Sequence, residues 1–276
     1  MRAGYWTAKR LAELDIQLSD LDRRILDDVA RFRLISGDQL RRLHMADFHR
    51  RSALRHLTHL VHEQVLARLD RQVGGVRSGS SGFVYFLGPA GSRLLAWSVG
   101  RRSWTPSTVF QRHTLGIAER YVQLVEESAR RHGTAIQTFE AEPDCWRTFV
   151  GSAGQSLILK PDGYFILRAP SFDEHWFLEV DFATHSLSAI RRKALVYSNY
   201  LASGREQERL GVFPRVWWWT PNDNRADALR RTLSETPFAQ MHTVCATDRA
   251  IWSPLSVDGE SHNVVDSTDD RSGRSL

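Results

Sequence analysis

The chain has 276 residues, of which 42% are hydrophobic, and this content is sufficient for two globular cores. No stretch approaches the roughly 18 uninterrupted apolar residues of a membrane helix, and the N-terminus lacks an apolar signal core, so we expect a cytoplasmic protein without a membrane partner. The two cysteines, Cys145 and Cys245, lie far apart, which argues against a disulfide framework and against structural zinc.

The formal net charge of +5 is unevenly distributed along the chain. Residues 1–104 contain 18 Lys and Arg against 10 Asp and Glu, whereas residues 105–276 contain 19 against 22, so the two parts carry +8 and −3. A basic surplus in one part of a chain is typical of a nucleic-acid-binding module, because phosphate neutralisation dominates non-specific affinity. A solvated basic face is the alternative interpretation.

The first hundred residues predict three helices in succession. Ser19 and Asp22 have the spacing of a capping box, and apolar residues at helical spacing continue to about residue 31. Ser36 precedes a second amphipathic stretch, and a third begins near Phe48. The third helix has basic side chains around its apolar stripe, as a recognition helix in the major groove of DNA does. Its candidate DNA-binding residues are Arg50, Arg51, Arg55, His56 and His59.

A β-hairpin is predicted directly after these helices. Residues 65–69 and 83–87 have the pattern of two strands, and residues 74–82 between them are rich in glycine and serine. Such a tip cannot pack into a core, but Arg77 and backbone amides on it can lie along a phosphate strand. Three helices and a hairpin in this order predict a winged helix-turn-helix over residues 1–98, with double-stranded DNA as its partner. A winged helix that contacts protein is the alternative.

Turn-forming and charged residues at 99–107 predict a linker, and residues 108–256 predict a mixed α/β domain. A helix at about 108–132 opens this domain, and we interpret His113 on its edge as a packed or capping histidine. The apolar run at 215–220 lacks alternation, which predicts a central parallel strand. Residues 257–276 are poor in apolar residues, and we expect them to be disordered. The expected strands are 136–140, 156–160, 164–167, 176–181, 216–220 and 242–246.

Three carboxylates accompany two of these strands. Asp162 follows a proline at one strand junction, and Glu179 and Asp181 alternate along a neighbouring strand, so they share one face. Because Mg²⁺ takes oxygen ligands, these three residues are the candidate ligands of Mg²⁺ or Mn²⁺. A bound ion would activate water and stabilise charge on phosphate oxygens, as phosphodiester cleavage requires. The alternative is a turn cap at Asp162 and surface ion pairs with Arg191 or Arg192.

Pro161-Asp162 followed by Glu179-x-Asp181 resembles the motif of the PD-(D/E)XK nuclease superfamily. The resemblance implies a restriction-endonuclease-like domain and a catalytic lysine, but Asp181 stands where the motif has that lysine. Lys193 lies at the margin of the apolar stripe of the next predicted helix and is the candidate replacement. The candidate catalytic residues are therefore Asp162, Glu179, Asp181 and Lys193. The chain has three lysines, and two of them, Lys160 and Lys193, border the motif.

The motif belongs to a longer pattern that consists of five segments. They are residues 86–91 (FLGPAG), 112–115 (RHTL), 160–165 (KPDGYF), 177–181 (FLEVD) and 192–197 (RKALVY). Together with the predicted winged helix, they resemble the replication-relaxation family of plasmids and integrative elements over about residues 18–255. The resemblance implies a role in plasmid replication, DNA relaxation or conjugative mobilisation. It also implies a relaxase or replication protein as a candidate partner, and it leaves a homodimer open.

Three functions are compatible with these features. The first is a metal-dependent DNA endonuclease or nickase whose winged helix selects the site. In the second, a degenerate nuclease fold is a non-catalytic scaffold that recruits a relaxase or a replication factor. The third is a winged-helix transcriptional regulator. The missing lysine favours the second function over the first, whereas three clustered acids favour the first over the third, because like charges repel and a scaffold has no need of them.

Overall fold

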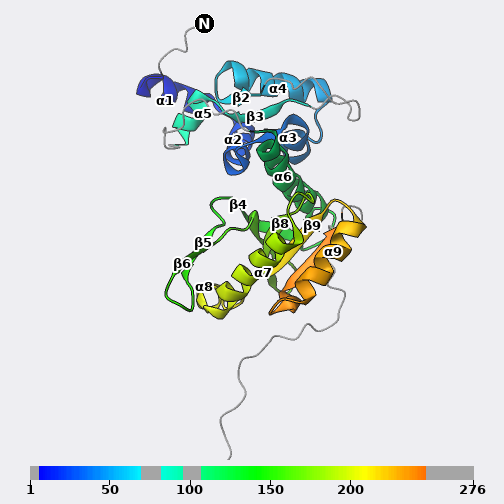
Figure 1. Cartoon of the computed structure of the whole chain (residues 1–276). Helices are drawn as coiled ribbons and strands as arrows, with labels where there is room; N and C mark the ends of the chain where they lie inside the picture. The colour runs from blue at the N-terminus through cyan, green and yellow to red at the C-terminus, as the bar shows by residue number, and fades with distance from the viewer. Residues whose placement is uncertain (1–5, 70–81, 96–106, 247–276) are drawn as a thin grey trace, which may run out of the picture.

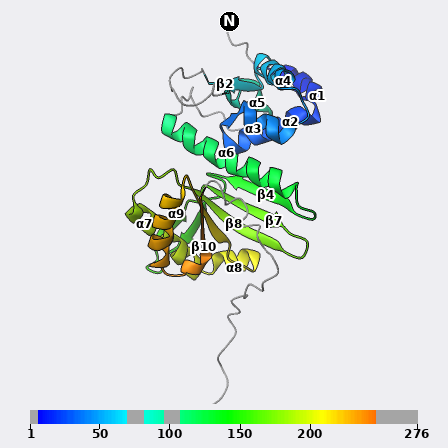
Figure 2. The ribbon, with the colours of Figure 1, turned by 90° about the vertical axis from the view of Figure 1, so that its right-hand side faces the viewer.

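The computed structural model describes residues 6–69, 82–95 and 107–246, and it has two halves that the long helix α6 (Thr108–Ser128) joins (Figure 1). Helices α1 to α5 and a small sheet form the N-terminal half, and a larger sheet with its helices forms the α/β half (Figure 2). The expected linker, apart from residue 107, and the expected disordered tail lie outside the described residues. None of the described helices is long and apolar enough to cross a membrane.

The N-terminal half begins with helices α1 (Ala8–Gln17), α2 (Asp20–Phe32), α3 (Gly37–His44) and α4 (Arg50–His62). The last three match the predicted helices. The capping box at Ser19 and Asp22 is formed, and Ser36 forms a second one with Gln39. Each cap satisfies backbone N–H groups that the first helical turn leaves without partners. Helix α1 was not predicted, and Leu14 is its one buried residue.

A small antiparallel sheet completes this half, in the order β1 (Ile35–Ser36), β3 (Val84–Leu87), β2 (Leu66–Arg68). Strands β2 and β3 confirm the two strands predicted for the hairpin, although both are shorter than expected. The tip between them, with Arg77, lies outside the described residues. Helix α5 (Pro89–Leu94) follows β3 and packs against β2.

The α/β half is built on a five-stranded sheet in the order β10-β9-β8-β7-β4. Strands β4, β7 and β8 pair antiparallel, whereas β8, β9 and β10 pair parallel, so β9 is a central parallel strand as its apolar sequence predicts. The bounds are β4 (Ala135–Ala141), β7 (Gly163–Arg168), β8 (Asp173–Val180), β9 (Arg215–Thr220) and β10 (His242–Ala246). Because β8 ends at Val180, Asp181 lies just beyond the strand that we expected to contain it.

Side chains that alternate along these strands form a separate core on each face of the sheet. Trp217 and Trp219 of β9 pack in the core that α6 covers, and Trp218 between them packs in the opposite core. The second core includes α7 (Leu187–Ala202) and α9 (Asp223–Ser234). The mixed α/β architecture expected from the sequence is therefore observed, with helices on both faces of the sheet.

Four further elements belong to this half. Strands β5 (Arg147–Val150) and β6 (Ser156–Leu159) form a separate two-stranded antiparallel sheet. The strand predicted at 156–160 is thus real but does not join the main sheet, and β5 was not predicted. The remaining elements are α8 (Arg205–Leu210) and the short 3-10 helix η1 (Ala239–Met241).

Candidate functional site

Two carboxylates face each other where β7 begins and β8 ends. Asp162 directly precedes β7, and antiparallel pairing of Gly163 with Leu178 places it next to Glu179 of β8. The Asp162 N–H donates to the Leu178 carbonyl at 3.0 Å, and the Val180 N–H donates to Asp162 Oδ2 at 2.7 Å. Both carboxylates are buried, with 7% of Asp162 and 2% of Glu179 exposed. The backbone of the sheet therefore holds both acids in place.

Helix α7 adds a lysine and a tyrosine to these acids. Lys193 Nζ donates to Glu179 Oε2 and lies 3.8 Å from Asp162 Oδ1. The Tyr197 hydroxyl donates to Glu179 Oε1 at 2.6 Å. Lys193 and Tyr197 are four residues apart, so the helix presents them on the same side. The expectation that Lys193 reaches the carboxylates from the helix agrees with this geometry.

Asp181 does not belong to this cluster, contrary to the expected ligand set. Its Oδ2 accepts from Arg225 Nε of α9 at 2.5 Å, and its Oδ1 accepts from the Ala183 N–H at 3.2 Å. The Asp181 N–H donates to the Trp219 carbonyl at 2.9 Å, which continues the pairing with β9 beyond the end of β8. This pairing directs the carboxylate toward the first turn of α9. The alternative interpretation, an ion pair with Arg191 or Arg192, is not observed for Asp181, which pairs with Arg225 instead.

A second set of donors surrounds Asp162. His113 Nε2 of α6 lies 3.3 Å from Asp162 Oδ1, and Glu142 follows β4, where its N–H donates to the Asp162 carbonyl at 3.2 Å. One donor atom from each of these three residues lies within 4.8 Å of the other two. Within residues 6–69, 82–95 and 107–246, no other three His, Cys, Asp or Glu side chains meet in this way. The expected set of Asp162, Glu179 and Asp181 is therefore not assembled as a metal-binding group.

The positions of His113 and Glu142 beside Asp162 are not predictable from the sequence pattern. The sequence predicts a packed or capping side chain at His113 and gives no role to Glu142. His113 and Glu142 are separated by 28 residues, and Glu142 and Asp162 by 19, so the three share no helix or strand and no local spacing connects them. The signal that was available is the position of His113 within the segment 112–115.

The pKa values of the two central acids move in opposite directions. Burial raises the pKa of the Glu179 carboxyl, although Lys193 opposes this. Burial also acts to raise the pKa of Asp162, but Lys193 and His113 outweigh it and hold this pKa below its usual value. Burial lowers the pKa of the Lys193 ammonium less than Glu179 and Asp162 raise it. One acid therefore stays ionised while the other has a high proton affinity, a pattern that is typical of acid–base sites.

The other lysine near the motif points elsewhere. Lys160 is exposed, and its Nζ lies 4.5 Å from the centre of the Trp146 ring. It has no contact with the two acids among the described residues. Of the two lysines that border the motif, Lys193 alone is in the cluster.

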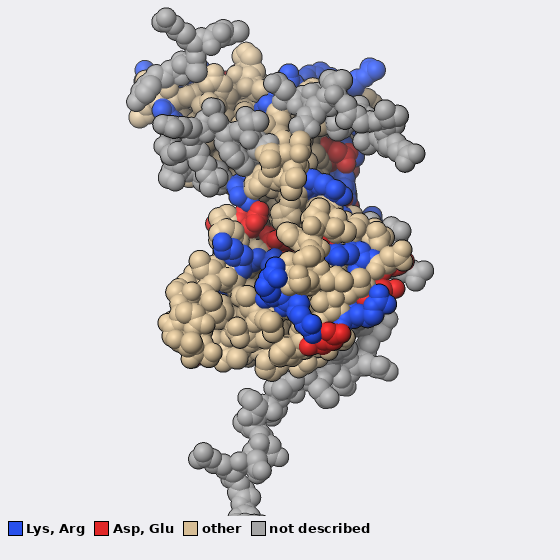
Figure 3. All heavy atoms as spheres, in the orientation of Figure 1, with Lys and Arg blue, Asp and Glu red and all other residues tan. Residues whose placement is uncertain are grey.

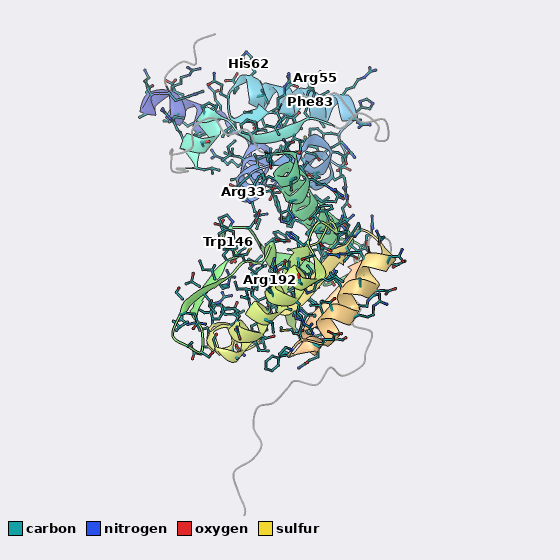
Figure 4. The ribbon with its side chains drawn as sticks, viewed as in Figure 1. Arg33, Arg55, His62, Phe83, Trp146 and Arg192 are labelled. Atoms are coloured by element: carbon teal, nitrogen blue, oxygen red, sulfur yellow. The ribbon has the colours of Figure 1, made fainter. Side chains whose placement is uncertain are left out.

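The candidate DNA-binding residues lie on α4. Arg50, Arg51, Arg55 and His59 are exposed, and Figure 4 shows Arg55 on the outer side of this helix. His56 is partly buried instead, because its Nε2 lies 2.8 Å from Asp22 Oδ1 of α2. Four of these five side chains therefore lie on an accessible surface, whereas His56 contacts α2.

A family model described as replication-relaxation matches residues 26–216. The matched range extends from α2 to the start of β9 and contains the whole acidic cluster. No curated protein and no solved structure matches the chain.

Proposed function

Because the chain belongs to the replication-relaxation family, we propose that it binds and nicks the DNA of a plasmid or integrative element during replication, relaxation or conjugative mobilisation. The N-terminal half would bind double-stranded DNA, and the α/β half would cut one strand with the help of a divalent metal ion. The observation that carries the proposed cleavage is the cluster of Asp162, Glu179 and Lys193.

The fold of each half supports this proposal. Helices α2 to α4 followed by the β2–β3 hairpin have the element order of a winged helix, in which the last helix enters the major groove. In the α/β half, a mixed five-stranded sheet with helices on both faces is compatible with the restriction-endonuclease-like domain that the motif implies.

Charge on the molecular surface is compatible with a DNA path to the acids. Figure 3 shows Lys and Arg atoms around the junction of the two halves, beside a smaller acidic area. Arg192 of α7, which is exposed, is labelled on the α/β side of this junction in Figure 4. Basic side chains at the rim of an acidic centre would hold the phosphate backbone while the centre acts on one bond.

The carboxylate oxygens at Asp162 and its neighbours fit Mg²⁺ or Mn²⁺ in chemical class, whereas the His113 nitrogen suits Mn²⁺ better. Asp162 is the carboxylate that two sets share, one with Glu179 and Lys193 and the other with His113 and Glu142. An ion held at Asp162 would activate water and stabilise negative charge on the phosphate. Lys193 of α7 would stabilise the same negative charge. It would thereby replace the lysine that the motif has at the position of Asp181.

Nicking of supercoiled plasmid tests this function. The protein is incubated with plasmid and Mg²⁺ or Mn²⁺, and nicked circles are separated from closed circles on a gel. We expect nicking by the wild type and its loss in Asp162→Ala, in Glu179→Ala and in Lys193→Met, with a rate at least about 100-fold lower for the lysine variant. Lys9→Met is the matched control, because Lys9 is 87% exposed on α1 and should leave the rate unchanged.

One observation favours a second function. The acid in the lysine position, Asp181, is neutralised by Arg225, as a structural ion pair would be. In a non-catalytic scaffold, the cluster would only stabilise the fold while the protein recruits a relaxase or a replication protein. Plasmid that is shifted on the gel but never nicked with either metal would support this scaffold and contradict the nickase.

A further inference from the structure

A cation from the N-terminal half already occupies part of the donor set around Asp162. Arg33 lies at the C-terminal end of α2, and its Nη2 donates to Glu142 Oε1 at 2.7 Å. The two side chains are 15% and 18% exposed, so this ion pair is shielded from solvent. The Arg33 guanidinium carbon lies 5.0 Å from the centre of the Phe110 ring of α6. This contact links the DNA-binding half directly to the acidic centre.

The backbone and side chain of Arg33 are unusual. Its φ is 64° and its ψ is −34°, a backbone conformation that residues other than glycine rarely adopt. Its Nε is buried and has no hydrogen-bond partner among the described residues. Strained backbone and an unsatisfied buried donor both cost free energy, and such features concentrate at functional sites. The contact with Glu142 is therefore a feature that the structure maintains at a cost.

The three residues of this donor set, His113, Glu142 and Asp162, come from separate segments, and backbone hydrogen bonds fix the positions of the two acids. His113 projects from α6, and the backbone pairing of Glu142 with Asp162 fixes the approach of the two carboxylates. Asp162 is itself held by the Leu178 carbonyl and the Val180 N–H. A metal ion gains most from ligands that are already in position, because little conformational entropy is then lost on binding.

We propose that His113, Glu142 and Asp162 form a binding site for a divalent first-row transition-metal ion, and that the ion and Arg33 compete for Glu142. A donor set of one imidazole and two carboxylates suits Mn²⁺ and its heavier neighbours, whereas Mg²⁺ prefers oxygen ligands alone. The site rests on the proposed function only in sharing Asp162, since ion binding requires neither DNA nor cleavage.

Binding of Mn²⁺ to the whole chain tests the site without any substrate. Free Mn²⁺ is followed by its electron paramagnetic resonance signal during a titration of the protein, first alone and then with excess Mg²⁺. We expect one site that Mg²⁺ does not readily displace, with affinity lowered about tenfold or more in His113→Gln and in Glu142→Gln. His132→Gln is the matched control, because His132 is exposed and should leave the affinity unchanged. Equal affinity in wild type and His113→Gln would overturn the site.

A second pair of variants tests the competition. Arg33→Gln removes the resident cation from Glu142, so we expect Mn²⁺ to bind about tenfold more tightly. Arg24→Gln, at an exposed position of the same helix, should bind like the wild type. Unchanged or weaker Mn²⁺ binding in Arg33→Gln, with an unchanged thermal unfolding midpoint, would contradict the competition.

The two proposals fail in different ways. Mn²⁺ binding that depends on His113, in a protein that never nicks plasmid, would leave the metal site standing and remove the nuclease. Nicking that depends on Lys193, in a protein whose Mn²⁺ affinity is unchanged by substitution of His113 or Glu142, would support the nuclease and contradict the metal site.

Discussion

Glu179 illustrates how a buried carboxylate is kept in this protein. Both of its oxygens have a donor, Lys193 on one and Tyr197 on the other. Removing one partner of a buried ion pair destabilises the fold far more than the intact pair stabilises it, because the remaining charge stays buried without a partner. The position of Lys193 thus follows from electrostatics even before any catalytic role is considered. This is why the nicking assay compares it with a lysine outside the cluster.

His242 is a buried titratable group with a different effect. Its Nδ1 accepts from Trp218 Nε1 at 3.1 Å, its Nε2 has no partner in the described part of the chain, and burial lowers its pKa to about 4. A pKa that is depressed on folding contributes stability above the unfolded value of 6.5, and this stability is lost as the pH falls toward 4.

We therefore expect the free energy of unfolding to decrease between pH 6.5 and 4, with a contribution from His242 on the order of 3 kcal/mol. Urea unfolding at a series of pH values measures this in the wild type and in His242→Gln, whose amide oxygen can still accept from Trp218. The variant should have the shallower pH dependence. Parallel pH profiles for the two proteins would show that another group is responsible. The exposed His132 gives a control with His132→Gln.

Helix α5 depends on close contact with the segment that leads into β2. The Gly88 N–H donates to the Val65 carbonyl at 2.9 Å, and the Ala90 N–H donates to the Gln64 carbonyl at 3.0 Å. A Cβ atom at Gly91 would lie 2.2 Å from the Val65 carbonyl oxygen. Because this oxygen belongs to the backbone, it cannot move aside as a flexible side chain would. Close packing against residues 64 and 65 therefore explains why both residue 88 and residue 91 are glycine.

Gly91→Ala should therefore push α5 away from β2 and destabilise the protein by about 1–3 kcal/mol. Chemical denaturation monitored by circular dichroism gives this difference. Gly82→Ala is the matched control, since a Cβ at Gly82 meets no atom within 4 Å. If the two alanine variants are equally stable, the close approach at Gly91 has no energetic consequence.

At the scale of the whole molecule, α6 is shared by both halves. Phe32 of α2, Tyr121 of α6 and Phe139 of β4 form a triangle with ring centroids 4.9 to 5.6 Å apart. Arg42 of α3 also pairs with two glutamates of α6, at 2.7 Å from Glu119 and 2.5 Å from Glu126. One apolar core consequently extends from the N-terminal half to the sheet.

Phe32→Ala should weaken both halves together, because its ring contacts an aromatic residue in each neighbour. A loss of about 3–5 kcal/mol is expected for a buried phenylalanine, measured as a single thermal transition at lower temperature. Phe48→Ala, at a side chain that is 42% exposed, should have little effect. Two separate transitions in the wild type would instead mean that the halves unfold independently.

Helix α4 lies on the side of the N-terminal half that faces away from the α/β half in both ribbon views (Figures 1 and 2). A duplex bound to α4, as the proposed function has it, would therefore be separated from the acidic centre by α2, α3 and α6. In the proposed function, a straight duplex on α4 would not reach the acids, and a second segment or a bend would be needed.

DNA binding through α4 should weaken steeply with salt. We expect Arg51→Ala with Arg55→Ala to lower the affinity and to reduce the slope of log affinity against log salt by up to about 2, one phosphate contact for each arginine. Fluorescence anisotropy with a labelled duplex at several salt concentrations measures this slope. Arg24→Ala is an exposed control on α2. A double variant with the wild-type slope would contradict DNA binding through this helix.

Local features of the sequence determined much of this protein. Apolar periodicity and capping residues predicted α2 to α4, and the unbroken apolar run of β9 predicted a central strand, because these signals depend on neighbours within a few residues. Lys193 was also placed near Asp162 and Glu179, since α7 directly follows β8. Only the tertiary structure decided which acids meet. Asp181 pairs with Arg225, whereas His113 and Glu142 lie beside Asp162 from distant segments and Arg33 pairs with Glu142. Electrostatic contacts of this kind depend on distance in space, and no local pattern in the chain encodes that distance.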